Sequence, residues 1–241
     1  MKAIKICITG NSVALRIRPP HEYPENKNYT SLLAEKLNQR FSDYRFLVEN
    51  KSIGADTVQN IYEKIDSIIH CFPDMYILNI GVVDACTREV PLWFFRLATR
   101  RNEDLISVFF RAFYRGLIAK IRPFLVILRG ERPWISKRKF EKYFSLIAET
   151  LQKETNSKII VLPINLTNSR VERMLPGSRK NQIKYNTILK QIADDYNLSF
   201  IELNDLDPVK HYPDGIHYSS SGHQIVSDRI LSKIVEVMQL S

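Results

Sequence analysis

The chain has 241 residues, of which 44% are hydrophobic and 25% are charged, as in an ordinary soluble globular protein, and its length suffices for one large α/β domain. No apolar run reaches the ~18–20 residues that a membrane span needs. The formal net charge of +9 predicts attraction to something anionic without identifying it.

Strand-like and helix-like segments alternate in the first third of the chain. Alternating or continuous apolar residues predict strands, and apolar residues at helical spacing predict helices. In chain order we expect a strand, a helix, a strand, a helix and a strand over Ala3–Thr9, Tyr29–Phe41, Tyr44–Glu49, Ala55–His70 and Asp74–Ile80.

The regular alternation stops between Arg88 and Lys142, and a long helix that begins at Lys137 overlaps the end of that stretch. In that stretch, Phe124–Leu128 is predicted as a short strand or as part of an irregular connection. The alternation then resumes as a helix, a strand, a helix, a strand and a closing helix over Lys137–Glu154, Lys158–Ile164, Lys180–Tyr196, Ser199–Leu203 and Ser220–Met238. The helix over Lys180–Tyr196 is expected to turn Ile183, Ile188, Ile192 and Ala193 inward.

This alternation predicts a parallel sheet covered by helices on both faces, in three α/β/α layers. We expect one domain over 1–241, with an insertion at about 88–135 after the third strand. In such a sheet the loops that follow the strands gather at one edge. The polar or glycine residues that follow strands would therefore meet there: Ser12, Gly54, Gly81–Asp84, Asn165 and the Asp214–His217 segment.

A serine and an acid–histidine pair are the most informative of these residues. Ser12 follows the first strand, and Asp214 precedes His217 by three residues. A hydroxyl nucleophile needs an imidazole to take its proton and a carboxylate to orient the imidazole. Taken separately, Ser12 also fits a helix N-cap, and Asp214 with its neighbours Pro213 and Gly215 also fits a surface turn.

Taken together, these segments resemble the SGNH, or GDSL, hydrolase family. The first block is Gly10-Asn11-Ser12 after a strand, the second is Gly54 after the second strand, and the last is Asp214 with His217 before the terminal helix. The resemblance implies a flavodoxin-like sheet, a Ser12–His217–Asp214 triad, and an oxyanion hole that includes the amides of Ser12 and Gly54.

The third block departs from the family pattern. The family usually has Gly-x-Asn-Asp after the third strand, and its asparagine helps to bind the oxyanion; here the segment is Gly81-Val82-Val83-Asp84, so Val83 has no side-chain donor. Losing one oxyanion donor typically costs about 10²–10³ in turnover. Asn11, Asn79 or Asn165 are candidates to compensate.

The resemblance implies a serine esterase or O-deacetylase that acts on an acyl ester, with a glycan or glycolipid ester as the preferred substrate. An acyltransferase with the same triad is one alternative. A non-catalytic glycan-binding member is another, because of Val83. Asn11, Asp84 and Arg88 are candidate substrate-binding residues, with Arg88 suited to a carboxylate or phosphate and Asp84 also suited to holding its loop through backbone amides.

Basic and aromatic residues are interleaved over 96–142. Three interpretations stay open: a helical insertion with solvated charges, a wall of the substrate pocket that binds an anionic substrate, and docking on an anionic membrane by a basic amphipathic helix around Leu105–Arg122. No recognised nucleic-acid motif accompanies the charge, so we expect no nucleic-acid partner.

The cysteine and histidine pattern predicts no cofactor and no metal site. Cys7, Cys71 and Cys86 match neither a zinc pattern nor a CxxC pattern, and no His/Cys/Asp/Glu cluster has ligand spacing. An odd number of thiols favours a reducing compartment. The start of the chain does not read as a signal peptide, so a cytoplasmic location is expected.

Overall fold

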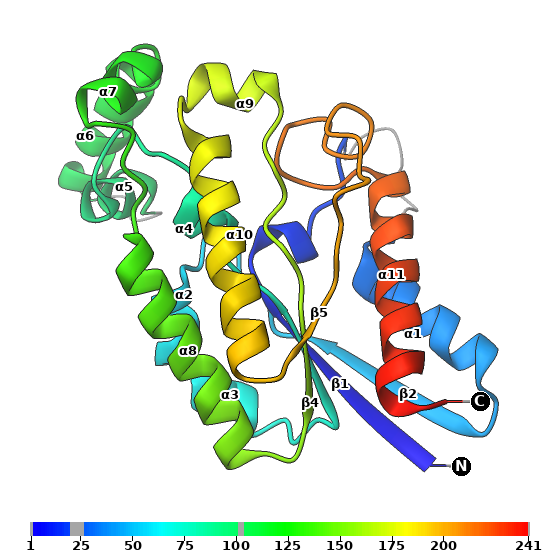
Figure 1. Ribbon diagram of the computed structural model, residues 1–241. Helices are drawn as coiled ribbons and strands as arrows, with labels where there is room; N and C mark the ends of the chain where they lie inside the picture. Colours follow the sequence, from blue (N-terminus) through cyan, green and yellow to red (C-terminus); the bar gives the residue numbers. More distant parts are fainter. Residues whose placement is uncertain (1, 20–26, 101–103, 241) are drawn as a thin grey trace.

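Five parallel strands form the central sheet of the computed structural model, which describes residues 2–19, 27–100 and 104–240 (Figure 1). The strand order is β2-β1-β3-β4-β5, which is the flavodoxin-like order. The strands are β1 (Lys2–Gly10), β2 (Tyr44–Asn50), β3 (Met75–Asn79), β4 (Lys158–Val161) and β5 (Ser199–Phe200). The predicted doubly covered parallel sheet is therefore confirmed.

Helices pack on both faces of this sheet and complete the three layers (Figure 1). One face carries α1 (Tyr29–Arg40) and α11 (Ser220–Met238), which pack against each other. The other face carries α2 (Val58–Glu63), α3 (Ile65–Ile69), α8 (Lys137–Glu154) and α10 (Ser178–Asp195). The central strand β3 is buried along its whole length, in keeping with the run of largely apolar residues from Met75 to Leu78.

The two central strands approach closely at the carboxyl edge of the sheet. A Cβ at Gly10, the last residue of β1, would lie only 2.1 Å from the backbone oxygen of Asn79 in β3. Glycine is therefore needed at this position. The chain leaves β1 for the short η1 helix (Ser12–Ala14) and leaves β3 for α4 (Val82–Ala85). These two segments diverge on either side of the β1/β3 boundary, where an open α/β sheet forms its ligand crevice.

The stretch between α4 and α8 is helical, which corrects the prediction for Phe124–Leu128. It contains α5 (Leu92–Thr99), α6 (Leu105–Phe113), the π-helical η2 (Tyr114–Ile118) and α7 (Arg122–Leu128), while residues 101–103 lie outside the described part. The residues of α7 favour strands, but proline in the first helical turn is pre-organised for a helix. Val126 of α7 packs with Val171 and Leu175 beside α9 (Ser169–Met174).

Two further details of the helices differ from the prediction. The helix expected over Ala55–His70 is divided at Lys64 into α2 and α3, and it begins at the Thr57 capping box. Ile183 was expected to face inward but is 51% exposed, because α10 buries Gln182, Tyr185 and Leu189 on its inner face. Among the described residues, no helix combines the length and the hydrophobicity needed to cross a bilayer.

Asp84 joins α4 to the start of α2 from a fully buried position. Its Oδ1 accepts a hydrogen bond from the Val58 amide at 2.9 Å, while its Oδ2 has no partner among the described residues. Burial raises the pKa of Asp84 to about 7, although the hydrogen bond from the Val58 amide acts in the opposite direction. The carboxyl group is therefore easier to accommodate in its protonated form.

This raised pKa predicts that Asp84 makes folding stability depend on pH. Its pKa in the folded state, about 7, exceeds the ordinary value of 3.8, so its contribution is fully present below about pH 4 and is lost as the pH rises through 7. Asp84→Asn keeps an acceptor for Val58 but does not titrate. In urea titrations from pH 4 to 8, the wild type should lose free energy of unfolding relative to Asp84→Asn. The exposed carboxylate variant Asp66→Asn is the control, and a pH-independent difference between wild type and Asp84→Asn would contradict the prediction.

Candidate active site

Ser12, His217 and Asp214 lie in one chain of hydrogen bonds at the carboxyl edge of the sheet. The Ser12 Oγ is 2.9 Å from His217 Nε2, and His217 Nδ1 is 2.7 Å from Asp214 Oδ2. Ser12 and His217, which are 205 residues apart in the sequence, are thus brought together by the sheet. All three side chains predicted for the triad meet at hydrogen-bonding distance.

The hydrogen bonds between Asp214 and His217 indicate which of their atoms carries the shared proton. Burial raises the pKa of Asp214, but hydrogen bonds from the His217 ring and from the His217 and Ile216 amides outweigh burial and hold that pKa well below its ordinary value. Asp214 is therefore an ionised, acceptor-only group, and His217 Nδ1 must carry the proton between them. With Nδ1 facing Asp214, Nε2 is the ring nitrogen that faces the Ser12 hydroxyl.

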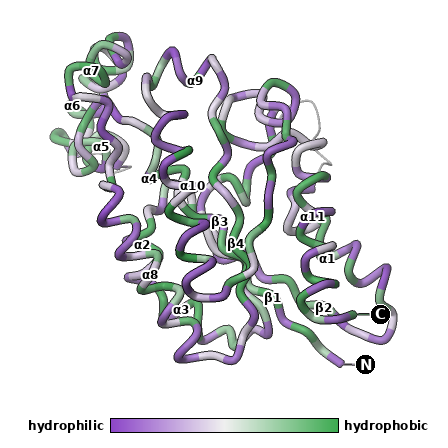
Figure 2. The backbone as a smooth tube through the Cα atoms, viewed as in Figure 1, coloured by the Kyte–Doolittle hydropathy of each residue, from purple (hydrophilic) through white to green (hydrophobic). Residues whose placement is uncertain are grey.

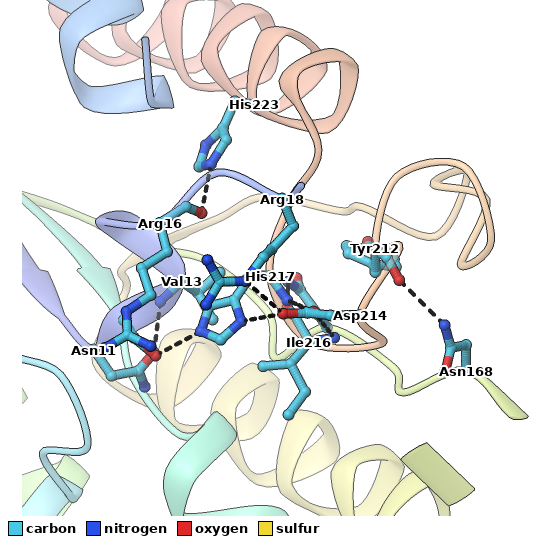
Figure 3. Close-up of polar contacts among 12 residues, drawn as sticks. Asn11, Val13, Arg16, Arg18, Asn168, Tyr212, Asp214, Ile216, His217 and His223 are labelled. Atoms are coloured by element: carbon cyan, nitrogen blue, oxygen red, sulfur yellow. Dashed lines mark hydrogen bonds and ion pairs between the residues drawn. The ribbon is translucent and has the colours of Figure 1, made fainter. Parts of the chain in front are cut away.

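Arg18 also contacts the Asp214 carboxylate, and the sequence pattern did not suggest this contact. Its Nε donates to Asp214 Oδ2 at 3.1 Å, the same oxygen that faces His217 (Figure 3). The two side chains are about a quarter exposed, so solvent screens this ion pair. Arg18 thus contacts one oxygen of the Asp214 carboxylate, while the Ile216 and His217 amides donate to the other. No spacing motif links residues 18 and 214, and only the fold brings them together.

The loop that carries Asp214 and His217 is held by side chains that follow β4. Asn168 Nδ2 donates to the Tyr212 carbonyl at 3.1 Å (Figure 3), and Asn165 Nδ2 donates to the Ile216 carbonyl at 3.1 Å. Gly215 adopts φ +85°, and a Cβ there would lie 2.5 Å from Asn168 Oδ1. The turn thus requires glycine both for its backbone conformation and for its close packing.

His223 supports the opposite side of the site. Its Nδ1 accepts from the Tyr29 amide at 3.0 Å, and its Nε2 lies 3.0 Å from the Arg16 carbonyl (Figure 3). Since Nδ1 is an acceptor, Nε2 carries the proton and the ring is neutral. Burial lowers the pKa of His223 to about 4, in keeping with that state. His223 therefore ties the loop after η1 to α1 and α11.

A cavity of about 250 Å³ opens beside Ser12 and His217. Its wall is mostly apolar and is supplied by four loops and by the helical insertion. The lining consists of Ser12, Arg16, Gly54, Ala55, Val82, Val83, Cys86, Arg88, Phe95, Trp134, Ile216 and His217. The cavity thus joins the Ser12 hydroxyl to an aromatic wall and two guanidinium groups.

Two backbone amides in this lining are available to an oxyanion. Ser12 is the first residue of η1, so its amide has no acceptor within the helix, and the Gly54 amide makes no hydrogen bond to the described protein groups. A Cβ at Gly54 would meet nothing within 4 Å. Val83 also lines the cavity and presents only methyl groups there.

The asparagines considered as replacement donors lie elsewhere. Asn79 Nδ2 donates to the Tyr29 hydroxyl at 3.0 Å, and Asn165 is engaged with the Ile216 carbonyl and the Tyr218 hydroxyl. Asn11 is fully buried outside the lining, where its side chain caps η1 and its Nδ2 has no partner among the described residues. None of the three contributes to the cavity wall.

The candidate substrate-binding residues divide into two groups. Asp84, like Asn11, is fully buried behind the wall and holds the backbone of α2. Arg88 lines the cavity, where its guanidinium stacks on Trp134 with 4.1 Å between Cζ and the ring centroid. The buried Nε of Arg88 has no hydrogen-bond partner among the described residues. Within the same part of the chain, no three His, Cys, Asp or Glu side chains gather as a metal site would require.

Solved structures with the same fold span nearly the whole chain. Axe2, an acetylxylan esterase from Geobacillus stearothermophilus, aligns with a TM-score of 0.62 at 18% identity over 96% of this chain and 94% of its own. LAE5, an alpha/beta hydrolase enzyme from the metagenome of Lake Arreo, Spain, aligns with a TM-score of 0.61 at 17% identity over 96% and 95%. The acetyl xylan esterase AlAXEase aligns with a TM-score of 0.61 at 18% identity over 96% and 100%.

Comparisons of the sequence itself with known proteins and with protein-family models complement this structural similarity. No curated protein matches the chain. The model of the GDSL-like Lipase/Acylhydrolase family matches residues 10–225, a range that contains Ser12, Asp214 and His217. The chain therefore belongs to the GDSL-like lipase/acylhydrolase family and is an ester hydrolase of the SGNH type.

Proposed function

We propose that Ser12 is the nucleophile of a serine esterase whose general base is His217 and whose orienting acid is Asp214. The observation that carries this proposal is the continuous Ser12–His217–Asp214 hydrogen-bond chain at the mouth of the cavity. A hydroxyl, an imidazole and a carboxylate in this order are the groups that acyl transfer to serine requires.

The reaction proceeds in two halves. Ser12 Oγ attacks the acyl carbonyl while its proton passes to His217 Nε2, and the tetrahedral intermediate collapses when His217 returns that proton to the leaving alcohol. A water molecule then attacks the acyl-serine, again giving its proton to His217, and Ser12 recovers it as the acid departs. Asp214 stabilises the imidazolium formed in each half and remains ionised throughout.

The Ser12 and Gly54 amides stabilise the oxyanion in this scheme. Both residues line the cavity, and both amides are free to donate to a substrate. Because Val83 offers only methyl groups, the oxyanion hole has only backbone donors at this position. The chain is thus expected to turn over more slowly than a homologous site with an asparagine there.

The cavity favours a short acyl group on a sugar. At about 250 Å³ it is at the small end of ligand pockets. Phe95 and Trp134, with ring centroids 4.6 Å apart, form an aromatic wall on which a sugar ring can stack. Axe2 is described as an acetyl-xylooligosaccharide esterase. We therefore favour O-deacetylation of a glycan or glycolipid, and the free thiols Cys7, Cys71 and Cys86 favour a cytoplasmic setting.

Arg88 suits an anionic group on that substrate. Stacking on Trp134 holds its guanidinium at the cavity wall, and a guanidinium can donate charge-assisted hydrogen bonds to a carboxylate or phosphate. Arg16, which is exposed at the same cavity, adds a second positive charge. Asn11 and Asp84 would support such a substrate indirectly, through the backbone of η1 and α2.

Replacement of the nucleophile tests the triad directly. Ser12→Ala should lower kcat for 4-nitrophenyl acetate by about 10³-fold or more, because the covalent route is lost. Ser67→Ala, a change at an exposed serine far from the cavity, should retain wild-type turnover. Wild-type turnover no greater than that of Ser12→Ala across a panel of acyl esters would rule out the esterase. Transfer of the acyl group to an added sugar in place of water would identify an acyltransferase.

Restoring an amide at position 83 tests the oxyanion hole. Val83→Asn should raise kcat at least about tenfold with little change in KM, because the added donor acts on the developing negative charge. Val82→Asn places the same side chain at the neighbouring lining position and should give no such gain. Unchanged turnover in Val83→Asn would mean that other donors already complete the hole. A wild type that binds glycans but gains turnover only with this change would favour the non-catalytic interpretation.

Charge removal at Arg88 tests the anionic substrate. Arg88→Gln should raise KM about tenfold for an acetylated sugar phosphate, since a charge-assisted hydrogen bond is lost. KM for the neutral acetylated sugar should stay as in the wild type. Arg132→Gln, at an exposed arginine outside the cavity lining, is the matched control. An equal rise in KM for both sugars would argue against the assigned role.

A further inference from the structure

The helical insertion presents an exposed apolar face away from the sheet. Along α6 and η2, Leu105, Phe109, Phe113 and Leu117 recur every four residues and are 87%, 63%, 39% and 47% exposed. In α7, three more large side chains are more than half exposed: Phe124, Ile127 and Leu128. Figure 2 shows this hydrophobic colouring at the end of the molecule that projects beyond the sheet.

This apolar face borders the packed side of the insertion, and Phe113 reaches both, since its ring lies edge-on to Phe94 with 6.5 Å between centroids. The Phe110 ring packs edge-on against Phe94 of α5, with 5.2 Å between centroids, and Ser107 is fully buried beside its N-cap Asp104. The orientation of α6 is thus already fixed by contacts on one side. Leu105 and Phe109 of the same helix expose large apolar groups to water, and contiguous exposure of that kind marks an interaction site.

The segment of the chain that carries the face has a large excess of positive charge. The 96–142 stretch contains thirteen Lys and Arg residues against four Asp and Glu residues, a difference of +9 that equals the net charge of the whole chain. Arg115 and Lys120 are exposed between the apolar side chains of η2 and α7. Neither forms an ion pair with any acidic residue in the described part of the chain.

We propose that the exposed face of α6, η2 and α7 docks the protein on an anionic lipid bilayer. Aromatic and aliphatic side chains can enter the boundary between headgroups and acyl chains, while the neighbouring cations attract anionic headgroups. A second copy of the chain is a poorer occupant, because two faces of the same positive sign repel each other. The docking surface consists of Leu105, Phe109, Phe113, Arg115, Lys120 and Phe124.

Docking would bring the cavity close to the lipid surface. Phe95 of α5 lines the cavity and also contacts Tyr114 of η2, with 5.9 Å between ring centroids. The same helices therefore connect the docking surface to the cavity wall. The docking itself needs no chemistry at Ser12, so it can be tested without the proposed esterase activity.

Vesicle co-sedimentation tests the docking surface. The full chain carrying Ser12→Ala, which removes turnover, is mixed with phosphatidylcholine vesicles with or without phosphatidylserine. We expect binding that requires phosphatidylserine and weakens with salt. Leu105→Ser with Phe109→Ser should weaken it at least about tenfold. Arg115→Gln and Lys120→Gln should each weaken it about fivefold.

Matched variants separate docking from general surface effects. Phe72→Ser changes a 72% exposed phenylalanine that follows α3, and Lys184→Gln changes an exposed lysine on α10; both should bind as the parent does. Circular dichroism melting verifies that each variant is folded. Absence of binding to phosphatidylserine vesicles at low salt, or binding unaffected by the α6 and η2 changes, would overturn the proposal. A dimer in solution that Phe109→Ser dissociates would assign the face to a second copy instead.

Discussion

The hydrogen bond between Asp214 and His217 is the constraint on which the rest of the site depends. At 2.7 Å it fixes which ring nitrogen carries the proton, and so decides that the other nitrogen faces Ser12. Asp214 keeps this role because two backbone amides and Arg18 share its oxygens. Without an ionised and oriented carboxylate, the 2.9 Å contact between Ser12 and His217 would not favour proton transfer.

The fold supplies this bond through two separate devices. The close approach of β1 and β3 at Gly10 places Ser12 at the carboxyl edge of the sheet. Asparagines after β4 then hold the final loop so that His217 returns to the same edge. The helical insertion adds the aromatic side of the cavity, and its outer surface remains free for a different task. The aromatic wall of the cavity and the proposed docking surface are thus carried by different faces of one insertion.

Residues with strong local patterns were predictable from the sequence. The buried strands and the Ser12, Asp214 and His217 positions follow from apolar runs, strand ends and the family blocks. The helix α7 was not predictable in this way, because Phe124–Leu128 is rich in strand-favouring residues and its helical state depends on packing against α9. The role of Arg18 could not be predicted either, because its contact with Asp214 joins residues 196 positions apart that share no motif.

Covalent labelling of Ser12 is the most direct test of whether His217 and Asp214 activate its hydroxyl. A fluorophosphonate reports whether a hydroxyl is activated by its neighbours, independently of any natural substrate. Intact mass and peptide mapping should show one adduct per chain, located on Ser12 and absent from His217→Ala. Failure of the wild-type chain to react, or an adduct on a different serine, would contradict the proposed role of the Ser12–His217–Asp214 chain.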